Sequence, residues 1–213
     1  MNGALLIGMI VLGGITLGWI LHHQSVRQMT PILRRLAAET NGVVKSQGPF
    51  VMPKLVFSHH GTDVELSSAS TGISGESIRY TYVLFNELAS KNFEFRIRPR
   101  SLQAVADEWA GFRKPMTTQV GKLKKHLVIY TNDNLLMEAV FSERIQADLL
   151  FWASGERENR ISDIRNYDDK LIYAVTGTLN NTKEFKLLLD SACNFFDEVN
   201  KVVSSSSRVA NNM

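Results

Sequence analysis

The apolar and polar positions of the chain separate an uncharged N-terminal stretch from a remainder with strand-like and helix-like patterns. Residues 3–21, GALLIGMIVLGGITLGWIL, are all apolar or small. At about 1.5 Å per residue, a helix over this stretch would measure roughly 28 Å, close to the ~30 Å hydrocarbon core of a bilayer. A signal peptide would begin with basic residues and end at a small-residue cleavage site, and this stretch has neither. The pattern therefore predicts an uncleaved transmembrane helix over residues 1–23.

Basic residues flank the predicted membrane helix on one side only, because Arg27, Arg34 and Arg35 follow it and none precedes it. The positively charged flank of a membrane helix stays in the cytoplasm. We therefore expect a single-pass protein of the cell (inner) membrane with a cytoplasmic soluble domain. The single cysteine, Cys193, is compatible with that reducing compartment. It also excludes an internal disulfide and any zinc site that needs two or four cysteines.

Small residues recur at four-residue spacing within the predicted membrane helix, at Ala4 and Gly8 and again at Gly14 and Gly18. Such pairs let two helix backbones approach closely in a bilayer. Glycine is also common in transmembrane helices in general. The pairs therefore leave two interpretations open: packing against a second copy or another membrane protein, and no packing at all.

The rest of the chain predicts short strands after one further helix. Thr30 and Pro31 are typical of a helix start and Asn41–Gly42 of its end, which predicts a juxtamembrane helix within residues 24–42. His60–Gly61 suggests a hairpin turn between two strands. Alternating or β-rich runs predict strands over residues 43–47, 54–58, 62–68, 77–84, 92–98, 127–130, 161–165 and 170–176. In the fourth run, one face carries Ile78, Tyr80, Tyr82 and Leu84.

Helix-type spacing fills several of the gaps between these strands. Helix starts are predicted at Thr131–Asp133, at Ser142 and at Asn181, where Glu184 completes a capping box. Further helix-type spacing, before a Gly, occurs at Leu102, Val105, Ala106 and Trp109. Polar residues 204–213 predict a frayed tail. The fold class is therefore α+β: an N-terminal transmembrane helix, then a domain over residues 43–203 of mostly antiparallel strands with two or three packed helices.

The order of segments from residue 77 onward resembles an uncharacterised bacterial family. The resemblance rests on SIRYTYVLFNE, FEFRIRPRS, GKLKKHLVIYTND, NLLMEAVFSERIQADLL, KLIYAVTGTL and TKEFKLLLDSACNFFDEV, and it covers roughly residues 1–200. It implies one N-terminal transmembrane helix and a single α+β domain, and it implies no catalytic residues because the family carries no assigned activity. Family members often have an acidic residue just before the strand at 127–130, where this chain has Lys124, Lys125 and His126.

Basic residues concentrate in one part of a chain whose overall charge is only +3. Arg96 and Arg98 share one face of a predicted strand, opposite Phe95 and Ile97, and the strand at 127–130 is expected in the same sheet. The predicted basic surface comprises Arg96, Arg98, Arg100, Lys122, Lys124 and Lys125. It would face anionic lipid or an acidic protein partner, or be merely solvated. No nucleic acid is expected, because the nearby aromatic residues have core-facing positions.

One further group of residues carries recognisable chemistry. His59, His60 and Asp63 are candidate ligands of a divalent metal. Adjacent histidines in a strand point to opposite faces, so a polar hairpin turn is the alternative interpretation. The chain has no phosphate-binding glycine loop, and we expect no cofactor and no catalytic residue. We therefore favour a single-pass membrane-anchored accessory or interaction protein, a subunit or partner of a larger membrane complex, over the alternative of a membrane-tethered enzyme.

Overall fold

The computed structural model describes residues 3–46, 48, 51–71, 78–89, 92–100, 122–154, 160–177 and 179–210, with the side chains of α1 described at residues 13 and 16 and from residue 23 onward. These residues form an eight-stranded sheet, four α-helices and one 3-10 turn. In chain order the elements are α1 (Gly3–Thr40), β1 (Val43–Lys45), β2 (Lys54–His59), β3 (Thr62–Thr71), β4 (Ile78–Phe85), β5 (Phe95–Pro99), η1 (Leu123–Lys125), β6 (Leu127–Thr131), α3 (Asn134–Val140), α4 (Glu143–Ala153), β7 (Arg160–Tyr167), β8 (Lys170–Thr176) and α5 (Thr182–Ala210).

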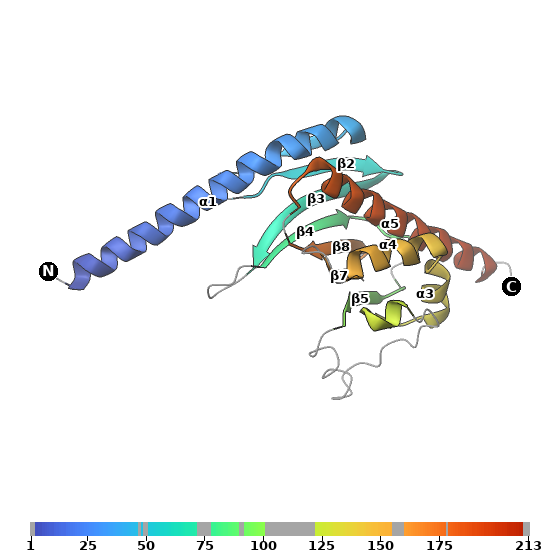
Figure 1. Cartoon of the computed structure of the whole chain (residues 1–213). Coiled ribbons are helices and arrows are strands. Elements are labelled where there is room, and N and C mark those ends of the chain that lie inside the picture. The colour runs from blue at the N-terminus through green and yellow to red at the C-terminus, as the bar shows by residue number, and fades with distance from the viewer. Residues whose placement is uncertain are drawn as a thin grey trace.

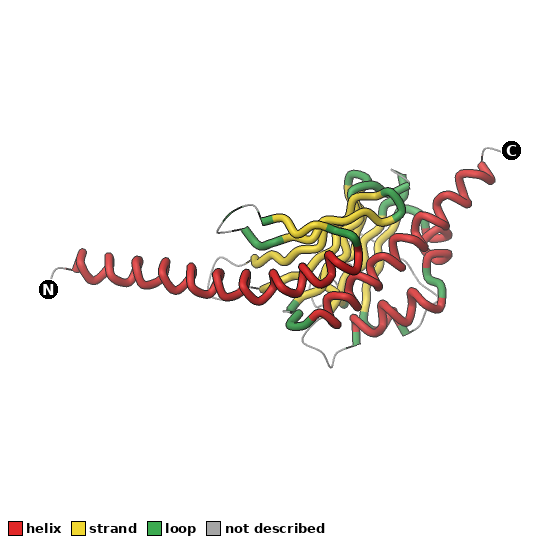
Figure 2. Tube along the Cα trace, turned by 90° about the horizontal axis from the view of Figure 1, so that it is seen from above, coloured by secondary structure: helices red, strands yellow, loops and turns green. Residues whose placement is uncertain are grey.

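The sheet has the order β1-β2-β3-β4-β8-β7-β5-β6, and every neighbouring pair is antiparallel. This confirms the α+β class and the mostly antiparallel sheet. The second half of α1 together with α4 and α5 lies over one face of the sheet (Figures 1 and 2). The hydrophobic core fills the space between these helices and the sheet, and the opposite face carries more polar side chains.

Helix α1 is continuous, so the predicted helix start at Thr30 and Pro31 was wrong. Pro31 lies inside the helix, and the hydroxyl of Thr30 donates to the Val26 carbonyl at 2.7 Å instead of capping a new helix. The second half packs into the core through Met29, Leu33 and Leu36, which are all buried. This burial holds the helix together across a proline that removes only one backbone donor.

The predicted end of this helix at Asn41–Gly42 is confirmed. Asn41 has a left-handed φ of 53°, and the Gly42 amide donates to the Ala37 carbonyl at 2.9 Å. A Cβ at position 42 would lie 2.8 Å from the Val56 carbonyl oxygen, so glycine is needed for the close approach to β2.

Among the described residues, no helix is long and apolar enough to cross a membrane. The predicted span rests on residues 1–23, whose side chains lie outside the described ones apart from positions 13, 16 and 23. The described side chains likewise do not include those of the predicted packing residues Ala4, Gly8, Gly14 and Gly18.

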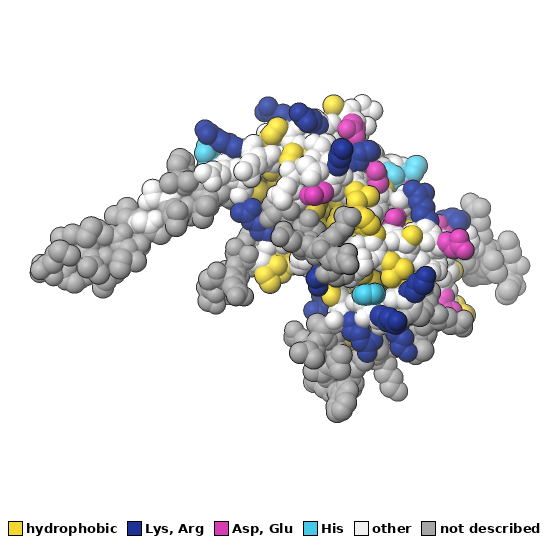
Figure 3. All heavy atoms as spheres, in the orientation of Figure 1, with side chains coloured by type: hydrophobic (Ala, Val, Ile, Leu, Met, Phe, Trp, Pro, Cys, Tyr) yellow, Lys and Arg dark blue, Asp and Glu magenta, His cyan; other side chains and the backbone are white. Residues whose placement is uncertain are grey.

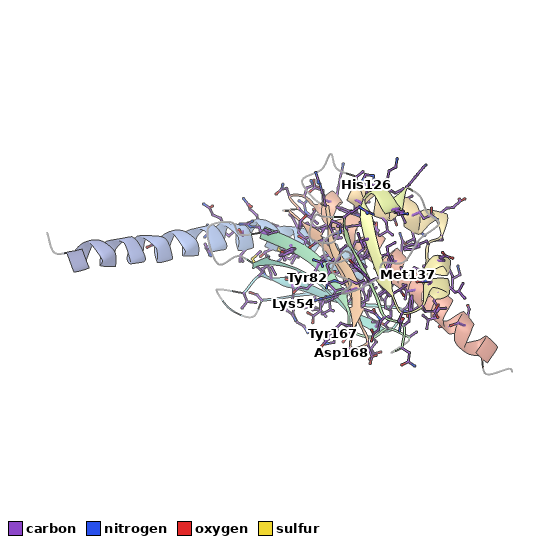
Figure 4. All side chains as sticks on the ribbon, turned by 90° about the horizontal axis from the view of Figure 1, so that it is seen from below. Lys54, Tyr82, His126, Met137, Tyr167 and Asp168 are labelled. Atoms are coloured by element: carbon purple, nitrogen blue, oxygen red, sulfur yellow. The ribbon has the colours of Figure 1, made fainter. Side chains whose placement is uncertain are left out.

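The strands follow the sequence pattern closely. All eight predicted strands are present, although β5 begins three residues later than expected. In β4 the residues Ile78, Tyr80, Tyr82 and Leu84 share one face as predicted, and the side chains packed in the core are those of the other face, Thr81, Val83 and Phe85. Both sets alternate and both contain apolar residues, so the pattern alone did not determine which one faces the helices. Tyr82 lies on the face away from the helices, as does Lys54 (Figure 4).

Two of the three predicted helix caps form as expected. Asp133 accepts the Leu136 amide at 3.0 Å, and Asn181 accepts the Glu184 amide at 3.0 Å while Glu184 accepts the Asn180 amide at 2.8 Å. Ser142 occupies the cap position of α4 without a side-chain bond. The helix-type spacing from Leu102 to Trp109 lies outside the described residues.

Helix α5 forms the centre of the core and extends further than the sequence predicted. It buries one stripe of side chains, comprising Phe185, Leu188, Leu189, Ala192, Phe195, Phe196, Val199 and Val203. The helix continues to Ala210, through residues that the sequence predicted as a frayed tail. The hydroxyls of Ser205 and Ser206 donate to the carbonyls of Lys201 and Val203, so these serines are accommodated within the helix.

Candidate functional site

Two histidines and one aspartate meet where the β2–β3 hairpin packs on α5. His59 Nε2 lies 2.8 Å from Asp197 Oδ1, and His60 Nε2 lies 3.7 Å from Asp197 Oδ2. One ligand atom from each of the three residues lies within 4.8 Å of the other two. Among the described residues, this is the group of histidine, cysteine and carboxylate side chains with the spacing of a metal site.

The hairpin turn brings the two histidines together. His59 is the last residue of β2, and its strand position directs it toward the helices, like Phe57 two residues earlier. His60 is not in the strand: its φ is +50°, and Gly61 follows with a φ of +87°. Positive φ at both central residues is typical of the tightest hairpin turns. The left-handed backbone turns the His60 ring back to within 4.3 Å of the His59 ring, measured between centroids.

Asp63 does not belong to this group. His59 pairs with Thr62 in the β2–β3 ladder, and Ser58 pairs with Asp63. Because side chains alternate along a strand, Asp63 lies on the sheet face opposite His59. The third member of the group is instead Asp197, which is 138 residues away from His59 in the sequence.

The three side chains differ in how firmly they are held. The His59 ring makes edge contacts with Phe85 and Phe196, which stack on each other with centroids 4.3 Å apart. Its side chain is 20% exposed, whereas that of His60 is 72% exposed and that of Asp197 is 42% exposed. The group is therefore anchored on one side and open to solvent on the other.

Cys193 lies one helical turn before Asp197 on α5. Burial raises the pKa of its thiol to about 12, and the negative charges of Asp197 and Asp190 act in the same direction. A nucleophilic cysteine requires the opposite shift, because the thiolate is the reactive form. Burial, followed by the charge of Asp148, likewise raises the pKa of Tyr173, whose buried hydroxyl has no hydrogen-bond partner among the described residues.

The structure divides the predicted basic surface into two parts. Strand β6 lies in the same sheet as β5, as predicted, and pairs with it directly, which places the whole set at one end of the sheet. Arg96, however, forms a two-pronged ion pair with Asp163: its Nε and Nη2 lie 2.7 and 2.9 Å from the two carboxylate oxygens. Its charge is therefore largely compensated. Arg165 lies 3.4 Å from the same carboxylate.

The second part of the basic surface lies around η1. Arg100 donates to the Lys124 carbonyl at 3.2 Å, and its amide donates to the His126 carbonyl at 2.7 Å. Lys122, Lys124 and Lys125 are all exposed here. Figure 3 shows basic side chains gathered at this end of the domain, and Figure 4 shows His126 at the end of the sheet opposite Tyr167 and Asp168. His126 directly precedes β6, at the edge of the sheet far from β2, so it lies apart from the His59–His60–Asp197 group.

Removing the basic charges around η1 should weaken binding to anionic membranes more than removing the Arg96–Asp163 ion pair. A chain of residues 24–213 carrying Lys122→Gln, Lys124→Gln and Lys125→Gln should bind anionic vesicles up to about 100-fold more weakly, at about 1 kcal/mol per basic residue near the surface. The double variant Arg96→Gln/Asp163→Asn is the control: it removes both members of an ion pair, keeps the net charge and should change binding little. Co-sedimentation at two salt concentrations measures this, with the larger difference at low salt. Equal binding of all variants at low salt would leave the surface as merely solvated.

A groove of about 500 Å³ opens between α1, β4 and the start of α5. Arg35 and Arg79 line it, together with Gln28 and Asn180. The Arg79 guanidinium donates to the Ser25 hydroxyl at 3.0 Å, which ties β4 to the middle of α1. The sequence predicted Arg35 only as part of the basic flank and did not point to Arg79, because the two lie 44 residues apart and only the fold brings them to one groove.

No protein-family model and no curated protein matches this sequence.

Proposed function

We propose that this chain is a single-pass membrane-anchored interaction protein, an accessory subunit or partner of a larger membrane complex, with its α+β domain on the cytoplasmic side of the cell (inner) membrane. The observation that carries the proposal is the continuity of α1. This helix joins the uncharged residues 3–21 to the core of the domain without a break.

Helix α1 has two halves in different surroundings. The second half contacts β1, β2 and α5, and it buries Met29, Leu33 and Leu36. The first half projects beyond the sheet (Figure 1). At about 1.5 Å per residue the whole helix measures roughly 57 Å, enough for a membrane span of ~30 Å and a packed half. A continuous helix would fix the orientation of the domain relative to the bilayer, as a subunit of an assembly requires.

In the proposed arrangement, the contact between Arg79 and Ser25 would lie at the level of the lipid headgroups. Ser25 follows the end of the uncharged stretch at Leu21 by four residues, or about 6 Å of helical rise. Headgroups occupy roughly 5–8 Å on each side of the hydrocarbon core. Ile78, next to Arg79 in β4, is 50% exposed. An arginine beside an exposed aliphatic residue suits the boundary between lipid tails and water.

The small residues of the predicted membrane helix and the groove both bear on where a partner helix would pack against α1. At about 100° per residue, helix positions 4, 8, 14 and 18 fall within an arc of roughly 120°, and that arc also contains positions 29, 33 and 36. A partner helix that packed on the small residues would therefore lie on the same side of α1 as the domain. Its cytoplasmic end would meet the groove, where Arg35 and Arg79 suit an acidic segment.

Two charges within the uncharged stretch should abolish membrane attachment. Each lysine at the centre of a membrane helix costs roughly 2.5–3.5 kcal/mol. The full chain with Leu12→Lys and Ile15→Lys should move from the membrane pellet to the supernatant after an alkaline wash. The matched variant with alanine at both positions should stay in the pellet, as should the unmodified chain. Recovery of the unmodified chain in the supernatant would contradict the anchor.

The same preparation tests orientation and partnership. Protease added to sealed, right-side-out cells should leave residues 30–213 intact, and digestion of the domain would place it outside. Purification in a mild detergent should yield a stoichiometric partner or a self-associated form. A monomer without any partner would contradict the role in a complex while leaving the anchor intact.

A further inference from the structure

We propose that His59, His60 and Asp197 together bind one divalent transition-metal ion of the zinc type, with the remaining coordination position open to water. The proposal goes beyond the membrane-anchored role and does not depend on it. It rests on the convergence of two imidazole nitrogens and one carboxylate within 4.8 Å.

The observed spacing needs little adjustment to accept such an ion. Zinc binds imidazole nitrogen and carboxylate oxygen at about 2.0–2.2 Å, so two ligand atoms in a tetrahedral site lie roughly 3.4 Å apart. The His59 nitrogen lies 2.8 Å from Asp197 Oδ1 and the His60 nitrogen lies 3.7 Å from Oδ2, on either side of this value, and one ligand atom of each residue lies within 4.8 Å of the other two. Movements of less than about 1 Å at each side chain would therefore complete three bonds to one ion.

The types of ligand define the class of ion. Imidazole suits Zn²⁺, Ni²⁺ and Cu²⁺, whereas Mg²⁺ and Ca²⁺ take oxygen ligands. Two imidazoles and one carboxylate form the ligand set of several catalytic zinc sites, in which water occupies the fourth position. The exposed sides of His60 and Asp197 leave space for that water and a path for the ion to enter.

The protein holds two of the ligands in place before any ion binds. The His59 ring is fixed between the sheet and α5 by its edge contacts with Phe85 and Phe196. The left-handed backbone of His60 directs its ring toward the same carboxylate. Ligands that are already in position lose less conformational freedom on binding, which favours affinity.

An ion at this position would join the β2–β3 turn to α5. Strand β2 ends on the side of the domain away from the projecting half of α1 (Figure 1), and histidine side chains reach the surface there (Figure 3). The open coordination position would therefore be accessible to water or to a side chain of another protein, at a distance from the proposed membrane contact.

The test uses the full chain in detergent, without a polyhistidine tag, titrated with zinc chloride by calorimetry. We expect one zinc ion per chain and an unfolding temperature that rises with zinc concentration, because an ion that binds only the folded state stabilises it. His60→Asn and Asp197→Asn should each weaken binding by at least about tenfold. Asparagine tolerates the left-handed backbone at position 60, so that variant should fold.

Matched controls exclude other histidines and carboxylates. His126→Gln, Asp190→Asn and the double variant His22→Gln/His23→Gln should bind zinc with unchanged affinity. Loss of binding in the His22/His23 variant would place the ion at the other end of the molecule and overturn the proposal. The proposal would also be overturned if the unmodified chain bound no zinc, or if the His60→Asn and Asp197→Asn variants bound zinc as tightly as the unmodified chain.

Cobalt provides a readout that does not depend on the variants. Co²⁺ bound to the unmodified chain should give the intense visible absorption of a tetrahedral site, and zinc should displace it. A weak spectrum like that of hydrated Co²⁺ would show that the side chains only form a hydrogen-bonded pair, and the proposal would fail.

Discussion

Leu33→Asp should unfold the α+β domain, although residue 33 precedes every strand in the sequence. The Leu33 side chain is completely buried, in the same core cluster as Leu55 and Phe196. Loss of a buried leucine costs about 2–5 kcal/mol, and burial of an unpaired carboxylate adds several more. That sum is comparable to the whole stability of a typical domain, about 5–15 kcal/mol. The full chain in detergent should therefore lose its cooperative unfolding transition.

The neighbouring residue provides the control. Arg34 is exposed, so Arg34→Asp introduces the same side chain one position away and should change the unfolding free energy by only about 0.5 kcal/mol. Urea denaturation followed by circular dichroism compares the two variants. If Leu33→Asp unfolded at the same urea concentration as Arg34→Asp, the second half of α1 would be a tether and not a part of the domain.

The strands could be predicted from the sequence because their signals are local. A period of two, glycine at the turn and β-branched or aromatic residues all lie within a few neighbouring positions, as in the β2–β3 hairpin around Gly61. The order of the strands in the sheet could not be predicted from such local signals. Strand β4 pairs with β8, and β5 lies between β7 and β6, so these contacts join segments that no local pattern relates.

The continuity of α1 shows how tertiary packing can override a local signal. Thr30 and Pro31 are good helix-start residues, and the sequence offers no local reason to continue through them. The continuous helix places Met29 in the core with Leu33 and Leu36. A new start at residue 30 would not have kept these three side chains on one stripe, and stripe burial stabilises helices more than propensity does.

The candidate metal site could be predicted only in part. The sequence identified His59 and His60, and it proposed Asp63 because that carboxylate is close in the chain. Two features of the fold could not be predicted from the sequence pattern. His60 leaves the strand with a positive φ, and α5 crosses the turn so that Asp197 reaches both rings. The alternation rule that counted against adjacent histidines applies within a strand, and His60 lies just outside it.

Cys193 should react with alkylating reagents about a thousandfold more slowly in the folded protein than in the unfolded chain. Burial, with the charges of Asp197 and Asp190, raises the pKa of its thiol from an ordinary 9.0 to about 12. At pH 8 an ordinary thiol is roughly one-tenth thiolate, and a thiol with that raised pKa is only about one part in ten thousand thiolate. Because the chain has one cysteine, iodoacetamide labelling reports on this residue alone.

The pH dependence of labelling gives the sign of the shift. In the unfolded chain the rate should level off above pH 9, whereas in the folded protein it should rise about tenfold per pH unit until the domain unfolds. Mass spectrometry after timed quenching, with and without urea, measures both rates. Fast labelling of the folded protein at pH 8 would reveal an accessible thiolate and would favour a membrane-tethered enzyme with a cysteine nucleophile. Slow labelling would argue against Cys193 as a nucleophile. The group of His59, His60 and Asp197 would then remain the candidate functional site among the described residues.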